Sequence, residues 1–468
     1  MIDTALYYLT VGDAGRAIRR GELSPVDLVD AYLARIESVD AALHSYLLVA
    51  GDRARDAARL AEAEQHAGRS RGPMHGIPYA AKDNYYTAGI RTCAGSRLML
   101  DHVPSYDAAA IERMRAAGAI LLGKLNTWEY GTGTGAVHFD LPYPPARNPW
   151  DTNRFTGGSS TGSGASVAAG TAMIALGSDT GGSVRLPAAA CGLQGLKPTF
   201  GRISRHGMLP NCYSADVPGA LAWTVEDSAL VLEALAGHDA RDPASAAQAV
   251  PSFTARLEDG VKDLVIGVVR DLGEDEAQLD AANRAGIEQM SRLLGAQGAR
   301  LIDIALPVPP REYQKALRIM NWTESLSIHE ADFLGRAHEM GQALRDKMMS
   351  GFMIRGVDYL AAQRRRRELT TAIDTVLRSL DALILPGAYH VAPPFSEPDR
   401  VLAYTSDSAC PMFSISGHPA MSVCTGFDAD GMPTNAQIAG KWFDEATVLR
   451  VARAYERETA WRDRRPAL

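Results

Sequence analysis

The sequence predicts an α/β protein built on a mixed, twisted β-sheet that is covered on both faces by helices. Two observations lead to this prediction. Short apolar runs, typical of buried strands, alternate along the chain with longer segments of helical period. The chain also has 468 residues, of which 46% are hydrophobic and 22% charged, so it can bury a large core. Strands that alternate with helices favour a sheet with helices on both sides.

The first half of the chain starts with helices and continues with strands. Ser24 before Pro25 indicates an N-cap followed by proline in the first helical turn. The apolar run in MHGIPYAAKDNYY predicts a strand that ends at Lys82. Two further buried strands are predicted at 119–122 and 173–176, each after a glycine that ends the preceding segment.

The second half repeats the alternation. DLVIGVV and ARLIDIAL predict strands on either side of a helix at 278–294, and DALILPG predicts a strand after a helix that begins near Thr370. HPAMSVCTGF and MPTNAQIAG predict two more strands, and 443–461 predicts a closing amphipathic helix. The least patterned segment, at about 240–365, is expected to form peripheral helices and a surface for substrate access.

Composition argues against several classes of partner. The net charge is −7 and no basic tail is present, so we expect no nucleic acid and no anionic membrane as a partner. The arginine run 364–367, next to Glu368, fits a solvated helix face better than a polyanion site. The N-terminus lacks the basic and apolar regions of a signal peptide, and no apolar run is long enough to span a bilayer.

The cysteines indicate neither disulfides nor a metal site. Five cysteines are irregularly spaced, with no CxxC pair and no Cys/His cluster. We therefore expect reduced, buried thiols in a cytoplasmic protein with no metal and no cofactor.

One stretch, 153–192, holds nine glycines and six serines between apolar runs. It does not fit a phosphate-binding loop, because no lysine follows GGSSTGSG. GTGTGA, from Gly131, lacks the strand before it and the helix after it that a dinucleotide site requires. The alternative is an oxyanion hole, in which successive backbone N–H groups converge beside a nucleophile.

SDTGGSVR fits that alternative. A strand ends, the chain turns through a Gly pair, and Ser183 precedes a predicted helix, as in a nucleophile presented at a strand–turn–helix junction. No histidine lies in a convincing triad motif; His75, His138, His206 and His418 are all in predicted loops. Lys82 is the other candidate base, because burial at the end of an apolar strand would lower its pKa.

Three ordered blocks resemble the amidase signature family of serine hydrolases: GIPYAAKD, TGGSSTGS and GSDTGGSVRLP. The similarity continues through KPTFGRISRHG, GHPAMSV and WFDEATVLRVARAYE, so it spans nearly the whole chain. It implies the amidase signature fold, with 1–468 as a single domain and about 60–235 as the catalytic core. The region at about 240–365 would then be the peripheral part.

The resemblance also implies a Ser-cisSer-Lys triad. Carried over by position, Ser183 is the nucleophile, Ser159 is the bridging serine after a cis peptide bond, and Lys82 is the base. The reaction would pass through an acyl-enzyme and need no metal or cofactor. The expected oxyanion hole consists of the backbone N–H groups of Thr180, Gly181, Gly182 and Ser183. The expected substrate contacts are Tyr130, Thr132 and Gly158.

The departures from the family pattern concern specificity. Thr156 replaces the usual proline before GGSS, and Asn435 replaces a usual glycine. We expect a stand-alone hydrolase of a small aryl or alkyl amide, carbamate or urea-like compound, and leave open whether it forms a homodimer. The alternative is the A subunit of a glutamyl/aspartyl-tRNA amidotransferase, which releases ammonia from glutamine for use by a partner chain. The third possibility, a non-catalytic binding protein, is disfavoured by the presence of all three triad residues.

Overall fold

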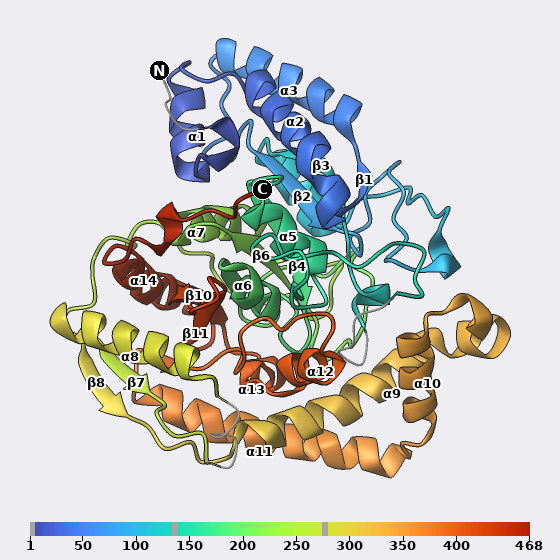
Figure 1. Ribbon diagram of the computed structural model, residues 1–468, viewed down its shortest axis with the longest axis vertical. Helices are drawn as coiled ribbons and strands as arrows, with labels where there is room; N and C mark the ends of the chain where they lie inside the picture. Colours follow the sequence, from blue (N-terminus) through green and yellow to red (C-terminus); the bar gives the residue numbers. More distant parts are fainter. Residues whose placement is uncertain (1–4, 133–138, 274–278) are drawn as a thin grey trace.

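The computed structural model describes residues 5–132, 139–273 and 279–468. Its centre is an eleven-stranded sheet with the strand order β1-β3-β2-β4-β6-β5-β10-β11-β9-β7-β8 (Figure 1). The strands are β1 (Tyr46–Val49), β2 (Pro78–Lys82), β3 (Ile120–Leu125), β4 (Ile174–Asp179), β5 (Gln194–Lys197), β6 (Val217–Ala222), β7 (Val265–Val268), β8 (Arg300–Asp303), β9 (Ala382–Leu385), β10 (Ala420–Phe427) and β11 (Pro433–Ala439).

The sheet is mixed, as predicted. β2 pairs in parallel with both β3 and β4, and β7 pairs in parallel with β8 and β9. β1, β6, β5, β10 and β11 join these groups through antiparallel pairs. Because β2, β3 and β4 run in one direction, their carboxyl ends meet at the same edge of the sheet.

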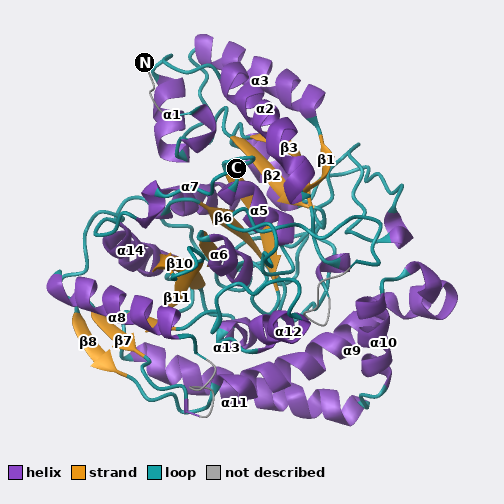
Figure 2. Cartoon of the chain, viewed as in Figure 1, coloured by secondary structure: helices purple, strands orange, loops and turns teal. Residues whose placement is uncertain are grey.

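Helices cover both faces of the sheet (Figure 2). Adjacent strand residues point to opposite faces, so Ala81 packs in one apolar cluster with α2, α3, α7 and α14, while Ala80 packs in another with α5 and α6. The helices are α1 (Val11–Arg19), α2 (Pro25–Leu43), α3 (Gly51–His66), α4 (Ala109–Ala116), α5 (Thr161–Ala168), α6 (Arg185–Cys191), α7 (Val225–Leu235), α8 (Ala281–Ala296), α9 (Pro310–Arg336), α10 (Gln342–Phe352), α11 (Gly356–Arg378), α12 (Pro398–Ser406), α13 (Cys410–Ser416) and α14 (Glu445–Glu456).

Local sequence cues explain several boundaries. The Ser24 hydroxyl accepts hydrogen bonds from the N–H groups of Val26 and Asp27 at 3.0 and 3.3 Å, which caps α2 as predicted. The helix expected to begin near Thr370 instead begins at Gly356, and Arg355 and Asp358 form its capping box. The predicted helix start at residue 278 lies outside the described residues.

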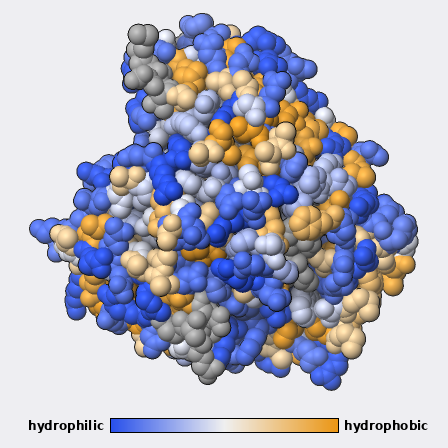
Figure 3. Space-filling model, in the orientation of Figure 1, coloured by the Kyte–Doolittle hydropathy of each residue, from blue (hydrophilic) through white to orange (hydrophobic). Residues whose placement is uncertain are grey.

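The segment at about 240–365 does more than form peripheral helices. It contributes β7 and β8 to one end of the sheet, and its helix α9 forms one wall of the cavity described below. Figure 3 shows a face that is largely hydrophilic, with smaller apolar patches between the hydrophilic residues. Within the described residues, every helix is too short or too polar to cross a lipid bilayer.

Candidate active site

The candidate site lies at the carboxyl ends of β2 and β4. Lys82 is the last residue of β2 and is fully buried. Its Nζ donates hydrogen bonds to Ser159 Oγ at 2.8 Å and to Ser178 Oγ at 2.9 Å. The parallel register that pairs Ala81 with Leu176 brings the end of β4, and with it Ser178, beside the lysine. Two of the three predicted triad residues are therefore in direct contact.

The surroundings of Lys82 favour the neutral amine. Burial lowers its pKa to about 7, although the more distant carboxylates of Asp216 and Asp179 oppose this shift. Asp83, the next residue, pairs instead with Lys124 at 3.1 Å. The Asp83 carboxylate therefore points away from the base, since successive residues of an extended segment face opposite sides.

Ser159 follows a cis peptide bond from Gly158, as the resemblance implied. A Cβ at position 158 would lie 2.3 Å from Trp128 Cζ2, so only glycine fits against the indole ring. The backbone fixes this loop to its neighbours: Trp128 N–H donates to the Ser159 carbonyl at 3.2 Å. Ser160 N–H donates to the Ser183 carbonyl at 3.3 Å, which joins the two serine-bearing loops.

The turn before Ser183 is built around a buried carboxylate. Asp179 Oδ1 accepts from Gly182 N–H and from Arg185 Nη2, each at 2.8 Å. Both side chains of the Asp179–Arg185 ion pair are fully buried, and Arg185 also donates to the Cys410 carbonyl at 2.8 Å. Gly182 has a φ of 130°, which a residue with a Cβ rarely adopts. These two charged residues hold the loop.

This hydrogen bonding reduces the number of N–H groups that are available to the expected oxyanion hole. The Gly182 N–H is occupied by Asp179, so it is not available to a substrate oxygen in this arrangement. Three of the four predicted N–H groups have no acceptor among the described residues: those of Thr180, Gly181 and Ser183.

Further polar contacts, which no sequence motif marks, support the turn from behind. Thr180 Oγ1 donates to Asp216 at 2.6 Å and accepts from Asn211 Nδ2 at 3.2 Å. Asn211 Oδ1 accepts from the buried Lys347 at 2.7 Å, and the same ammonium donates to Thr132. Burial lowers the pKa of Lys347 to about 7. Sequence reasoning missed Lys347, which lies on α10, far from the triad blocks along the chain.

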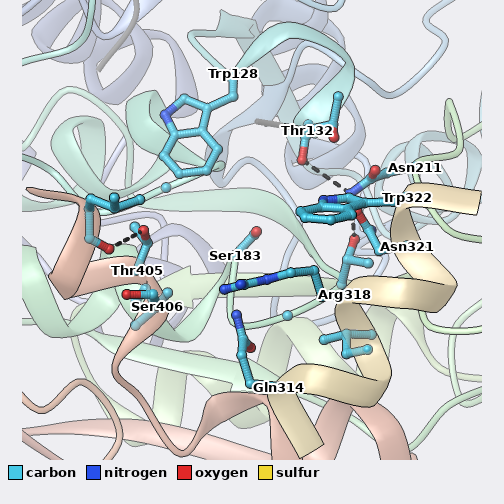
Figure 4. A pocket seen from close by; sticks show the side chains of 17 residues that line it. Trp128, Thr132, Ser183, Asn211, Gln314, Arg318, Asn321, Trp322, Thr405 and Ser406 are labelled. Atoms are coloured by element: carbon cyan, nitrogen blue, oxygen red, sulfur yellow. Dashed lines mark hydrogen bonds between the residues drawn. The ribbon is translucent and has the colours of Figure 1, made fainter. Parts of the chain in front are cut away.

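Ser183 opens onto a cavity of about 490 Å³, whereas Lys82 and Ser159 lie buried and are absent from its lining. Figure 4 shows the Ser183 hydroxyl between Trp128 on one side and side chains of α9 on the other. The lining residues come from the serine loops, α6, α9 and α12: Trp128, Gly131, Thr132, Gly158, Thr180, Gly181, Ser183, Leu186, Asn211, Gln314, Leu317, Arg318, Asn321, Trp322, Leu402, Thr405 and Ser406.

The cavity corrects part of the predicted substrate contacts. Thr132 and Gly158 line it, but Tyr130 does not. The Tyr130 ring lies 4.4 Å from that of His329 and is buried among Met340 and neighbouring apolar residues, so it is a core residue.

Ser178, which was not among the expected site residues, also belongs to the site. It accepts a hydrogen bond from Lys82, and Asn84 Nδ2 also donates to it at 3.0 Å. Its position at the end of the apolar strand next to that of Lys82 is the sequence feature that could have revealed it. Among the residues that the structure describes, no group of three or more His, Cys, Asp or Glu side chains is arranged to hold a metal ion.

Comparisons with known proteins agree with this geometry. Residues 27–449 match the Amidase family model. The peptide amidase of Stenotrophomonas maltophilia is 31% identical, with 98% of each chain covered and a TM-score of 0.86. A chain from a vestigial protein complex linked to the origins of an s-triazine catabolic enzyme is also 31% identical, covers 98% of this chain and 100% of its own, and has a TM-score of 0.89.

A curated relative changes the view of possible partners. The A subunit of the glutamyl-tRNA(Gln) amidotransferase of Chloroflexus aggregans is 39% identical, with 99% of each chain covered. The prediction of a small amide as sole partner, with no nucleic acid, is therefore contradicted, since this relative belongs to an enzyme named for a tRNA. A net negative charge disfavours direct binding of polyanions. It does not exclude that a protein acts as one subunit of an assembly in which another subunit binds the nucleic acid.

The family match covers most of the chain, and the similar structures reproduce its sheet and helices over nearly their full length. The same blocks place a buried lysine, a serine after a cis peptide bond and a glycine-rich turn around one cavity. The chain belongs to the amidase family, with the fold of the amidase signature enzymes, and is an amide-hydrolysing enzyme.

Proposed function

We propose that Ser183, Ser159 and Lys82 form the catalytic triad. The observation that carries this proposal is the 2.8 Å contact between the fully buried Lys82 Nζ and Ser159 Oγ, with the neighbouring carboxylate of Asp83 held by Lys124. A lysine whose pKa lies near 7 has a substantial neutral fraction at neutral pH, so it can accept a proton.

We infer the proton path from the Lys82–Ser159 contact and from the order of the triad that the family resemblance implies. Neutral Lys82 accepts the Ser159 hydroxyl proton, while Ser159 accepts the proton of Ser183. The Ser183 oxygen then forms a bond to the amide carbonyl carbon, and the oxyanion is stabilised by N–H groups of the turn 180–183. The protons return to the leaving nitrogen as the C–N bond breaks. Water, activated by the same relay, then hydrolyses the ester to a carboxylic acid and restores Ser183.

For the physiological reaction, we infer release of ammonia from the side-chain carboxamide of glutamine, in the manner of the A subunit of an amidotransferase. The support is the 39% identity over 99% of both chains to a protein of that name, and relatives of the same name from other organisms are 36–38% identical. In such an assembly, the ammonia would pass to a partner that carries glutamyl-tRNA.

A second candidate is a stand-alone hydrolase of a small amide or urea-like compound. It is favoured by the similarity to the Stenotrophomonas maltophilia peptide amidase over 98% of both chains. Both candidates use the same triad and differ in the acyl group that the cavity accepts.

Ammonia release from glutamine by the purified chain distinguishes the two candidates. The assay is run on the chain alone and with purified partner chains of a glutamyl-tRNA(Gln) amidotransferase, with glutaramide and pentanamide as comparison substrates. The amidotransferase proposal predicts glutamine hydrolysis that increases when the partner chains bind. Rapid hydrolysis of the comparison amides, with no glutamine hydrolysis under either condition, would establish the second candidate instead.

A further inference from the structure

The charge of the cavity is unbalanced. Of the residues that line it within the described structure, Arg318 is the one with an ionised side chain at neutral pH, and none is Asp or Glu. The other polar groups are amides and hydroxyls, such as Asn211, Gln314, Asn321 and Thr405. A neutral substrate needs no such cation, so the arginine points to a negative charge on the substrate.

Arg318 is free to bind that charge. It lies on α9, and Figure 4 shows its side chain extending from the helix into the cavity towards Ser183. Its guanidinium carbon is 5.7 Å from the centroid of the Trp322 ring, a contact that orients the group without occupying its donors. Within the described structure, it has no carboxylate partner. Lys315, on the same helix, pairs with Glu312 at 2.8 Å.

We propose that Arg318 binds a carboxylate at the far end of the substrate, so that the enzyme acts on amides whose acyl part carries a second, ionised carboxyl group. This inference rests on the proposed amide hydrolysis at Ser183. A guanidinium presents a planar fork of donors that matches a carboxylate, and a hydrogen bond of this kind is stronger than one between neutral groups. Glutamine belongs to this class through its α-carboxylate.

Lys347 is another basic side chain near the cavity, but it lies behind the wall, and burial lowers its pKa to about 7. Its buried amine donates to Thr132 and Asn211, whose side chains separate it from the open space. A carboxylate entering the cavity therefore meets Arg318 first. Lys347 orients the polar wall that holds Thr132 and Asn211.

The test compares two substrates that differ at one end. Glutaramate carries a carboxylate where pentanamide has a methyl group, and both present the same primary amide. Arg318→Gln should raise the KM for glutaramate about 10- to 100-fold, the loss expected for a charge-assisted hydrogen bond, and change that for pentanamide by less than about 3-fold. Arg318→Lys should fall between, since it keeps the charge but not the fork.

Lys315→Gln is the matched control, because it removes a cation from the same helix outside the cavity. It should leave both KM values unchanged, and thermal unfolding should show that each variant is folded. An equal loss on both substrates, or no loss on glutaramate, would overturn the proposal. If wild type hydrolyses neither amide, protection of Ser183 from a fluorophosphonate by glutarate replaces the assay. Protection that requires Arg318 supports the proposal, and absence of protection overturns it.

The carboxylate proposal and the glutamine proposal can each fail while the other stands. A chain that hydrolyses glutaramate through Arg318 but never glutamine would disprove the amidotransferase role and leave the carboxylate site standing. Glutamine hydrolysis that is unaffected by Arg318→Gln would do the reverse.

Discussion

The two sides of the cavity are built in different ways. The floor, where we propose that the chemistry takes place, consists of Lys82, Ser159, Ser178 and the turn 180–183, which come from three separate parts of the chain and are held by hydrogen bonds between buried groups. The α9 wall, namely Gln314, Leu317, Arg318, Asn321 and Trp322, comes from one helix. The spacings 314–317–321 and 314–318–322 are three or four residues, so these side chains share one helical face.

This difference separates the chemistry from the choice of substrate. On the floor, a shift of one group disturbs several others, since Ser178 contacts both Lys82 and Asn84. On the wall, the side chains project from one helix and are linked by fewer contacts, such as that between Arg318 and Trp322, so one residue can change while the helix stays in place. Substitutions on the floor should therefore reduce kcat, whereas substitutions on the wall should mainly alter KM.

The largest effect is expected at Ser183. Ser183→Ala removes the attacking oxygen and should lower kcat by about 10⁴-fold or more, while thermal unfolding stays close to that of wild type. Labelling with a fluorophosphonate, followed by peptide mass spectrometry, should place the adduct on Ser183. An adduct on Ser159, or substantial turnover by the alanine variant, would contradict the assignment of the nucleophile.

A loss of about 10²–10⁴-fold in kcat is expected for Lys82→Arg, because a guanidinium cannot give up its proton at the operating pH. The wild-type rate should rise with pH through a limb near 7, since burial lowers the pKa of Lys82 to about 7 and only the deprotonated amine is a base. The check is the pH dependence of kcat for both proteins. Near-native turnover by the arginine variant would rule out the proton relay.

An intermediate effect is expected at Ser178. Ser178→Ala removes one of the two hydroxyls that hold the Lys82 amine, and kcat should fall about 5- to 10-fold, the equivalent of one ordinary hydrogen bond. KM should stay the same, because Ser178 does not line the cavity. Steady-state kinetics on one amide measure both constants. A change confined to KM would place Ser178 with the wall instead of the floor.

The smallest effect is expected on the wall, away from its charged residue. Gln314→Ala shortens a partly exposed side chain at the cavity and should change KM by less than about 3-fold, with kcat unaffected, because a solvent-exposed hydrogen bond contributes little. Kinetics with pentanamide and glutaramate measure this. A kcat loss comparable to that of Ser178→Ala would show that the wall and the floor are coupled.

Apart from Ser178, the members of the floor could be predicted from the sequence residue by residue, whereas for the wall only a region, at about 240–365, was expected to provide a surface for substrate access. The floor is recognisable because its members occur in local sequence motifs. These are the glycines at a tight turn, the lysine at the end of an apolar strand and the serine after a Gly pair. A face with spacings of three and four residues occurs in any amphipathic helix, so nothing distinguished α9 from the other helices.

The same reasoning explains two of the differences between the expected and the observed site. Tyr130 is adjacent in sequence to residues that line the cavity, but side-chain direction depends on backbone dihedrals that a sequence does not display. Lys347 belongs to the site only through long-range packing of α10.

The contact between Gly158 and Trp128 also constrains how this enzyme can change over time. With only 2.3 Å between a hypothetical Cβ at position 158 and the indole, any side chain there is blocked while the tryptophan remains. A new specificity on this side of the cavity must therefore arise in a fixed order, with a smaller residue at position 128 first and a larger one at 158 second. In directed evolution, position 158 would yield no viable single variants, yet it would become available in a Trp128→Leu background.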